Sequence, residues 1–340
     1  MKPISFLLVH SDQHMKSTLP SSLAKTLVAL VLSSTSMLAA ESPFIGRYAL
    51  NLPGGGAGWL GVEEKAGALS SSILWGGGSV VPTAGTKIDG ETLIVTRTQK
   101  NKEGKVTTEI LTAKAEGDTL KLTTVKHNAE GKQMGQPAEF TGKRIADIPA
   151  KPDLAAVKYG EPIQLLNGKD LTGWRLLKEA DNGWRVVDGV LQNRVVKAKD
   201  KHFGNLRTDA EFEDFNLKLE VRTQENSNSG IYLRGIYEVQ IMESFGKQLD
   251  SHHMGALYSR ITPSVSAEKP IGEWQTMDIT LVDRHLTVIL NGKTLIDNQP
   301  VLGCTGGAMT SDETKPGPIY LQGDHTNVDY RNMVLRPVVK

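Results

Sequence analysis

The chain has 340 residues, and its 39 basic and 38 acidic residues leave a net charge of +1. This balance gives no electrostatic reason to expect nucleic acid or an anionic membrane surface as a partner. The length leaves room for two domains, each with its own core. The single cysteine, Cys304, excludes a disulfide within the chain, and we expect it to be a buried small residue rather than a nucleophile.

Residues 1–40 differ from the rest and have the three-part layout of a secretory signal peptide. Lys25 precedes an apolar run from Leu27 to Leu32, and small residues lead to Ala40. The run is shorter than the roughly 20 apolar residues of a membrane-spanning helix. We therefore predict an exported protein, periplasmic or extracellular after removal of the signal peptide, without a stable membrane anchor.

Residues 44–145 read as a small all-β domain, in which short strand-like runs alternate with glycine-bearing turns. Successive hairpins of this kind close most simply into a meander or a small barrel. The segment holds no cluster of titratable residues, so we interpret it as an accessory domain. Residues 146–159 carry two prolines, Pro149 and Pro152, and no apolar periodicity, which predicts a linker.

Residues 160–340 are predicted to form a second all-β domain. Apolar and polar residues alternate from Phe215 to Arg222, as in a half-buried strand. Asp188-Gly189 and Asn291-Gly292 are typical of type I′ hairpin turns. Many short strands and no convincing helix predict a sandwich of two sheets.

The stretch from Ser229 to Glu243 alternates strictly between apolar and polar residues on either side of Gly235. Each half therefore has one apolar and one polar face. Two interpretations fit. The polar face is either an ordinary solvated surface or the floor of a binding site. Tyr232, Arg234, Glu238 and Gln240 together supply the flat surface and fixed hydrogen-bonding groups that recognise a sugar-sized ligand, so we adopt the second interpretation.

Seven segments of the second domain form a specific series of motifs when taken in order. They are Leu166–Trp174, Trp184–Leu191, Asn228–Gly235, Tyr237–Ile241, Gly272–Trp274, Leu290–Lys293 and Gly317–His325. Together they resemble the 3-keto-disaccharide hydrolase domain family over residues 160–338. The resemblance implies a concanavalin-like jelly-roll sandwich with its site on the concave face, and an exported enzyme that cleaves glycosides oxidised at C3.

The chemistry of such a substrate defines what its site must contain. A ketone at C3 acidifies the C2 hydrogen, so removal of that proton can expel the group at C1, and water can then complete a net hydrolysis. The site needs a base near C2, an acid for the leaving group and a stabiliser for the enolate oxygen. Glu238 and Glu243 are the candidates for base and acid, and Arg234 or a bound cation for the oxyanion.

His325, beside Asp324, has three open interpretations: an acid or base, a metal ligand, or a residue of a turn. Cofactors are unknown from the sequence, and a divalent cation is one candidate. Its ligands would come from Glu238, Asp250, His252 and His325, although no short metal-binding spacing links them.

The remaining site residues are predicted to recognise the substrate, an oligosaccharide or glycoside. They are Tyr232, Gln240, Gln322 and Asp324, together with Trp274. For Trp274 a place in the core is the alternative to ring stacking, because tryptophan carries so much apolar area.

Two further functions remain open. The first is a sugar-binding, lectin-like module without catalysis, since one fold serves many functions. The second is a conventional glycosidase with two carboxylates, in which Glu238 and Glu243 would lie roughly 5 to 9.5 Å apart.

Overall fold

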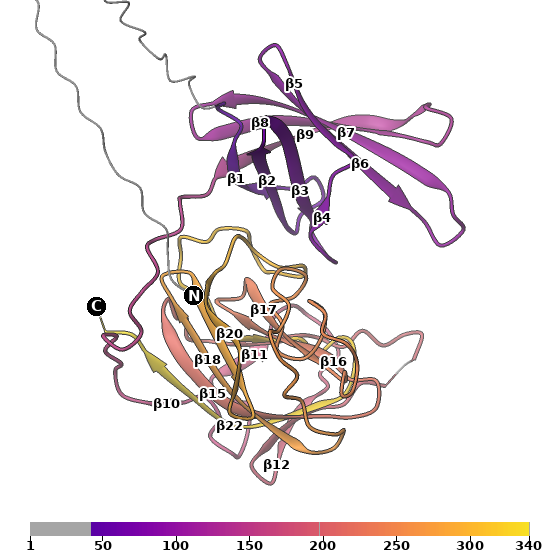
Figure 1. The fold of residues 1–340 in the computed structure, drawn as a ribbon. Helices are drawn as coiled ribbons and strands as arrows, with labels where there is room; N and C mark the ends of the chain where they lie inside the picture. Colours follow the sequence, from indigo (N-terminus) through magenta and orange to yellow (C-terminus); the bar gives the residue numbers. More distant parts are fainter. Residues whose placement is uncertain (1–41, 197, 340) are drawn as a thin grey trace, which may run out of the picture. The chain divides into compact units, whose positions relative to one another are not determined.

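The computed structural model describes residues 42–339 except residue 197, and this part of the chain consists of strands and loops without a helix (Figure 1). All ladders between the described strands are antiparallel. The all-β class predicted from the sequence is therefore confirmed. The predicted signal peptide lies outside the described residues. Within residues 42–339, no helix is long and apolar enough to cross a membrane.

The first nine strands form one sheet, drawn in indigo to magenta in Figure 1, with the order β4-β3-β2-β1-β9-β8-β7-β6-β5. We call it the leading sheet. Its strands are β1 (Gly46–Asn51), β2 (Ala57–Lys65), β3 (Ala68–Trp75), β4 (Val81–Pro82), β5 (Gly85–Asp89), β6 (Thr92–Lys100), β7 (Val106–Glu116), β8 (Thr119–His127) and β9 (Gln133–Arg144).

The two edges of the leading sheet meet near Ser71. The Ser71 hydroxyl on β3 hydrogen bonds to the hydroxyl of Thr86 on β5 at 2.6 Å, and the Thr83 amide donates to the Ser71 carbonyl at 2.9 Å. The edge strands are consecutive in the chain, so a short connection is enough to bring them together. The sheet therefore curls as a small barrel does, which leaves little unpaired edge.

The remaining strands form two sheets that pack as a sandwich. The eight-stranded sheet contains β10 (Ile163–Gln164), β12 (Trp184–Val187), β13 (Val190–Asn193), β15 (Phe215–Thr223), β18 (Trp274–Val282), β19 (His285–Leu290), β20 (Lys293–Pro300) and β22 (Val328–Pro337). The five-stranded sheet has the order β11-β14-β21-β16-β17. Its strands are β11 (Trp174–Leu176), β14 (Leu206–Thr208), β16 (Asn228–Leu233), β17 (Tyr237–Met242) and β21 (Tyr320–Leu321).

Both predicted hairpin turns are confirmed. Asn291 and Gly292, between β19 and β20, have φ values of 50° and 78°. Asp188 and Gly189, between β12 and β13, have φ values of 51° and 77°. Positive φ at both central positions is what a type I′ turn requires, and asparagine, aspartate and glycine adopt it most readily.

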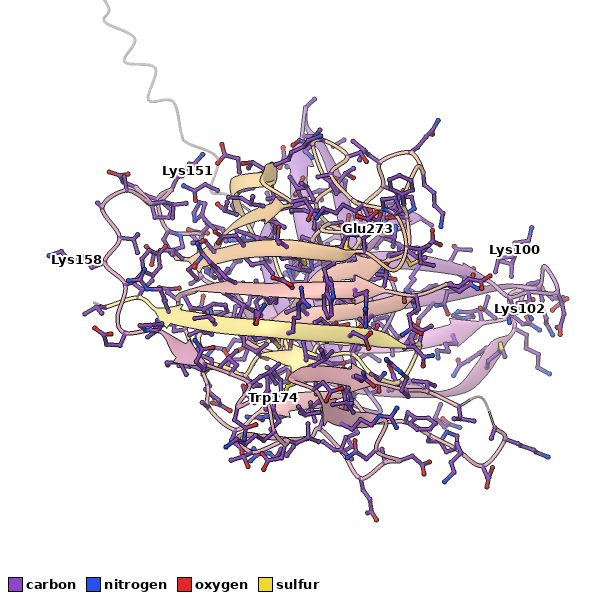
Figure 2. The ribbon with its side chains drawn as sticks, turned by 90° about the horizontal axis from the view of Figure 1, so that it is seen from below. Lys100, Lys102, Lys151, Lys158, Trp174 and Glu273 are labelled. Atoms are coloured by element: carbon purple, nitrogen blue, oxygen red, sulfur yellow. The ribbon has the colours of Figure 1, made fainter. Side chains whose placement is uncertain are left out.

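The sandwich core also contains residues of the leading sheet. Ala57, Trp59 and Leu74 belong to the same cluster of buried apolar side chains as the sandwich strands, and Trp59 is only 6% exposed. Figure 2 labels Trp174, the first residue of β11, which also packs into this cluster. A second cluster lies within the leading sheet alone. The first cluster thus contains side chains of the leading sheet and of the sandwich. The division into domains at 44–145, 146–159 and 160–340 stays a prediction.

Two segments differ from what the pattern of residues predicts. Strand β9 pairs with β1 and β8, although most of its residues are exposed and polar, so it carries no apolar alternation. Conversely, the run from Pro318 to His325 pairs as a strand only at Tyr320 and Leu321. In both segments, pairing with neighbouring strands determines the secondary structure more than the local pattern of apolar and polar residues does. Cys304 is fully buried, as expected, and burial raises the pKa of its thiol to about 12.

Candidate active site

A cavity of about 850 Å³ lies on the face of the five-stranded sheet opposite to the sandwich core. Ile231 and Val239 point into the core, whereas the alternate residues Tyr232 and Glu238 line the cavity. Its volume is in the range of pockets that bind small ligands. The lining residues are Gly56, Gly77, Gly78, Leu177–Ala180, His202–Asn205, Asn228, Tyr232, Glu238, Gln240, Tyr258, Gly306–Met309, Tyr320, Gln322, Asp324 and His325.

The floor of the cavity is a row of side chains across three adjacent strands. Tyr232 on β16 is paired with Tyr320 on β21 and with Glu238 on β17. The two tyrosine rings are stacked, with centroids 4.2 Å apart and planes 12° from parallel. Directly opposed residues on one face of a sheet lie close together, so this register brings two phenols and one carboxyl into contact range.

A second row follows, with Gly230 in its centre. Gly230 is paired with Gln240, and its carbonyl accepts a hydrogen bond from the Gln322 amide at 2.9 Å. A Cβ atom at Gly230 would lie 2.1 Å from Oε1 of Glu238. The absence of a side chain at this position is therefore what lets the Glu238 carboxyl lie over the strand.

Burial dominates the electrostatics of Glu238. The residue is only 3% exposed, and desolvation raises the pKa of its carboxyl to about 8. A hydrogen bond with Tyr232 lowers this pKa in part, and the nearby charge of Asp324 raises it. At neutral pH the Glu238 carboxyl is therefore mostly protonated and able to donate a proton.

The Tyr232 hydroxyl lies between two acceptors. It donates a hydrogen bond to the Gly306 carbonyl at 2.7 Å, and it also faces the Glu238 carboxyl. One phenol proton serves one acceptor at a time. While that proton is held by Gly306, a protonated Glu238 has the Tyr232 oxygen as its acceptor; the raised pKa of Glu238 itself comes from its burial.

Asp324 and His325 form a hydrogen-bonded pair at the edge of the cavity. Nδ1 of His325 lies 2.5 Å from Oδ1 of Asp324, and this bond raises the pKa of the imidazole above its usual value, against a smaller effect of burial. Asn205 holds the turn, because its side-chain oxygen accepts hydrogen bonds from the amides of Gly323 and Asp324 at 2.7 and 3.2 Å. The arrangement leaves Nε2 as the ring atom that can act on a ligand.

Two buried amide oxygens line the cavity without a hydrogen-bond partner among the residues that the structure describes. They are Oε1 of Gln240 and Oε1 of Gln322. Buried polar atoms normally have partners, so these two are free to accept hydrogen bonds from the hydroxyl groups of a ligand. The Gln240 side chain is held in place by a bond from its Nε2 to Oδ1 of Asn228 at 3.2 Å.

Of the residues predicted from the sequence, the cavity brings together six: Tyr232, Glu238, Gln240, Gln322, Asp324 and His325. Arg234 lies elsewhere. It is 4% exposed, and its guanidinium donates to the backbone carbonyls of Glu313, at 2.7 Å, and Lys315. These bonds tie down a loop, and the Arg234 side chain is not among those that line the cavity.

Glu243 and Trp274 also lie outside the lining. Glu243 follows the last residue of β17 and pairs with Lys247 at 3.4 Å. Trp274 is on β18 of the other sheet and is half-buried, with the guanidinium groups of Arg222 and Arg331 at 4.6 and 4.0 Å from its ring centroid. Its ring therefore makes cation–π contacts with two arginines.

The candidate metal ligands Asp250 and His252 bind each other at 2.6 Å, and the hydrogen bond from His252 lowers the pKa of Asp250. Nε2 of His252 lies 2.7 Å from the Ser79 hydroxyl. In the part of the chain that the structure describes, no three histidine, cysteine or carboxylate side chains are grouped as metal ligands.

Sequence reasoning missed three residues of the site: Gly230, Tyr320 and Asn205. Tyr320 is two residues from Gln322, and residues two apart on a strand share a face, so the choice of Gln322 could have indicated Tyr320 as well. Asn205 has no such signal, because it lies in a loop that reaches the site only through tertiary contacts. Its Nδ2 donates to the Tyr320 hydroxyl at 2.9 Å.

The site therefore offers a protonated carboxyl, an imidazole with one free nitrogen and a phenol with an available proton. Burial raises the pKa of Tyr320, so its hydroxyl keeps its proton. Groups of this kind, arranged around one cavity, are the requirements of acid–base chemistry at neutral pH.

Solved structures with related sequences were found for about half of the chain. Three candidate glycosyl hydrolases from Parabacteroides distasonis ATCC 8503 each cover 52% of this chain. The first is 29% identical over 83% of its own length with a TM-score of 0.42. The second is 21% identical over 94% with a TM-score of 0.45, and the third 25% identical over 100% with a TM-score of 0.40.

Among curated proteins, none matches this chain. The family model of the 3-keto-alpha-glucoside-1,2-lyase-like domain matches residues 161–336, which is more than half of the chain and includes every predicted site residue. The chain therefore belongs to the 3-keto-alpha-glucoside-1,2-lyase-like domain family, which confirms the family predicted from its sequence.

Proposed function

We propose that this protein cleaves the glycosidic bond of 3-keto-glycosides by removing the proton at C2. The observation that carries the proposal is the buried Glu238 carboxyl, with a pKa of about 8, in the same cavity as the Asp324–His325 pair. The family description, which refers to a lyase acting on 3-keto-alpha-glucosides, supports the choice of substrate.

His325 is the base in this proposal. Its Nδ1 is bound to Asp324, so its Nε2 faces a substrate, and the carboxylate stabilises the imidazolium that forms when the proton arrives. Glu238 is the acid. Because its pKa lies above neutral pH, the carboxyl carries the proton that an alkoxide leaving group needs.

The reaction begins when Nε2 of His325 takes the proton from C2. The electron pair of the C–H bond moves into an enolate with the C3 carbonyl, whose oxygen becomes negative. The Tyr320 hydroxyl can donate to this oxygen, because its own oxygen accepts a hydrogen bond from Nδ2 of Asn205 and its proton remains available.

The enolate then re-forms the ketone, a C1=C2 double bond appears, and the C1–O bond breaks. The leaving oxygen takes the proton of Glu238. Addition of water across C1=C2 returns one proton to C2 and gives net hydrolysis. Elimination and hydrolysis therefore share the first step and differ only in the fate of the unsaturated ketone.

The other residues of the floor bind the sugar. Oε1 of Gln240 and Oε1 of Gln322 accept from ring hydroxyls, and the stacked rings of Tyr232 and Tyr320 give the sugar a flat surface. A conventional glycosidase built on Glu238 and Glu243 has less support. Glu243 follows the end of β17, pairs with Lys247 and is not among the residues that line the cavity.

The test compares a 3-keto-disaccharide with its unoxidised parent, with product release followed by chromatography. Cleavage of the keto sugar alone, with solvent deuterium at C2 of the hydrated product, is expected. Cleavage of the parent sugar would favour a conventional glycosidase instead. Binding of either sugar without turnover would favour a lectin-like module and refute the proposal that the protein is an enzyme.

Export to the periplasm or the cell exterior is part of the same proposal. Its support is the layout of residues 1–40 alone. Sequencing the amino terminus of the mature protein tests it, and a mature chain that retains residues 1–40 would refute it.

A further inference from the structure

We propose that the glycine-rich segment Gly76–Ser79 of the leading sheet limits the size of the leaving group that the cavity accepts. The inference rests on the proposed function and assigns a role in specificity to a part of the chain outside the family match at 161–336. We call Gly76–Ser79 the glycine wall.

The glycine wall lines the cavity although it belongs to another sheet. It follows β3, and Gly77 and Gly78 line the cavity together with Gly56 from the turn before β2. Three glycines present backbone and no side chains. The volume on this side of the cavity is therefore set by how closely the backbone approaches.

Direct bonds hold the glycine wall against the sandwich. The Gly307 amide donates to the Gly76 carbonyl at 3.2 Å, and a Cβ at Gly306 would lie 1.9 Å from the Gly78 carbonyl oxygen. The Ser79 hydroxyl lies 2.7 Å from Nε2 of His252. The contact of the two glycine segments is so close that a side chain at Gly306 would push the wall away.

A buried contact of Arg260 also joins the leading sheet to the segment that precedes Gly306. The guanidinium of Arg260 lies 4.4 Å from the centre of the Trp59 ring, and the same guanidinium donates to the Cys304 carbonyl at 2.9 and 2.6 Å. Trp59 belongs to the leading sheet, whereas Cys304 precedes the Gly306–Met309 lining. The Arg260 side chain therefore contacts both the leading sheet, at Trp59, and the sandwich segment that leads to Gly306, at Cys304.

The glycine wall lies on the side of the acid, Glu238, rather than on the side of the base, His325. The Tyr258 amide donates to the Glu238 carbonyl at 3.0 Å, and the next residue, Ser259, accepts from the Val80 amide through its hydroxyl at 3.0 Å. This chain of bonds places the wall on the β17 side of the sheet. Asp324 and His325 follow β21, on the other side of β16. The leaving group, which receives the proton of Glu238, therefore lies next to the wall.

Gly77 offers a way to narrow the cavity without a clash. A Cβ atom there would meet nothing within 4 Å, and its backbone is not in the left-handed region. The series Gly77→Ala, Gly77→Leu and Gly77→Trp adds bulk in steps. The matched control is Gly85→Trp, on β5 of the same sheet. The nearest atom to a Cβ there is 3.9 Å away, and Gly85 is not among the residues that line the cavity.

The experiment measures kcat/KM of the full chain for methyl 3-keto-α-glucoside and for a 3-keto-disaccharide, with the thermal midpoint of each variant as a folding control. We expect Gly77→Trp to lower kcat/KM for the disaccharide at least about tenfold more than for the methyl glycoside. Gly77→Leu should have an intermediate effect, whereas Gly77→Ala and Gly85→Trp should keep the ratio of the wild type.

Equal effects of Gly77→Trp on both substrates, including no effect on either, would overturn the inference while the proposed function stands. If the wild type turns over neither substrate, the proposed function fails and the inference falls with it. The wild-type measurement alone separates these two failures.

Discussion

Oε1 of Glu238 occupies the space that a side chain of Gly230 would fill, 2.1 Å from the position of the missing Cβ. The two residues lie on paired strands: Gly230 is opposite Gln240, which is two residues from Glu238 on β17. A buried carboxyl usually needs a polar partner or a proton, and Glu238 has both the Tyr232 hydroxyl beside it and a pKa of about 8. The glycine on β16 thus determines where the acid on β17 can lie.

Substitution Gly230→Ala tests this relationship. The Cβ clashes first with the end of the flexible Glu238 side chain, so the carboxyl moves while the backbone stays. We expect turnover to fall roughly 100-fold, as for loss of a general acid, and stability to change by less than about 1 kcal/mol. Steady-state kinetics and chemical denaturation measure the two effects. Gly85→Ala, on β5, is the control and should leave turnover unchanged; wild-type turnover in Gly230→Ala would disprove the relationship.

Substitution Glu238→Gln removes the acid but keeps its shape. Turnover of a 3-keto-glycoside with an alkyl leaving group should fall roughly 100-fold or more, and the thermal midpoint should not fall, because a neutral amide replaces a buried carboxyl. A leaving group of low pKa, such as nitrophenol, should recover part of the loss, since it leaves without a proton. Glu243→Gln is the control with the same chemical change outside the cavity lining. Ordinary rates in Glu238→Gln would remove this residue from the mechanism.

The raised pKa of Glu238 also predicts how stability depends on pH. Between pH 4.5, the ordinary pKa of a glutamate, and about pH 8, the folded protein holds a proton on Glu238 that the unfolded chain has lost. Stability from this group is therefore fully present below pH 4.5 and is lost as pH rises through 8, with a slope of up to about 1.4 kcal/mol per pH unit. Urea denaturation from pH 5 to 9 measures the slope. The difference between wild type and Glu238→Gln isolates it from His325, which changes stability in the same direction. Parallel curves for the two proteins would contradict the prediction.

Asp324→Asn tests the pairing of Asp324 with His325. The carboxylate raises the pKa of the imidazole, so its removal should lower that pKa. A base must be deprotonated to act, and we therefore expect the acid limb of the kcat/KM profile to move to lower pH, with a smaller maximum. Asp250→Asn is the matched control, because Asp250 makes the same contact with His252 outside the cavity lining. An unmoved acid limb in Asp324→Asn would exclude His325 as the base.

The sequence contains enough information to predict the floor of the site. Strict alternation from Ser229 to Glu243 specifies which side chains share a face, and the β16–β17 hairpin follows that pattern residue by residue. The pairing of Tyr232 with Tyr320 is different, since 88 residues separate them along the chain and only the order of strands in the sheet brings them together. Periodicity within one segment carries no information about such a neighbour.

Arg234 illustrates why alternation alone misplaces a residue. The pattern puts it on the face of Tyr232, but it follows the last paired residue of β16 and has a φ of 54°. The turn redirects its side chain to the carbonyls of Glu313 and Lys315. Glu243 likewise lies one residue beyond the end of its strand, β17. The register of the hairpin therefore does not determine where the side chain of either residue points.

The indole of Trp59 reaches from the leading sheet into the core of the sandwich, where it is almost fully covered. A graft of the sandwich onto a foreign amino-terminal partner would remove Trp59 and expose the part of the core and the Arg260 guanidinium that its indole covers. An indole buries on the order of 150–250 Å². If the leading sheet is exchanged between relatives, Trp59 and the residues around it have to be exchanged together. We therefore expect the leading sheet and the sandwich to evolve as one unit.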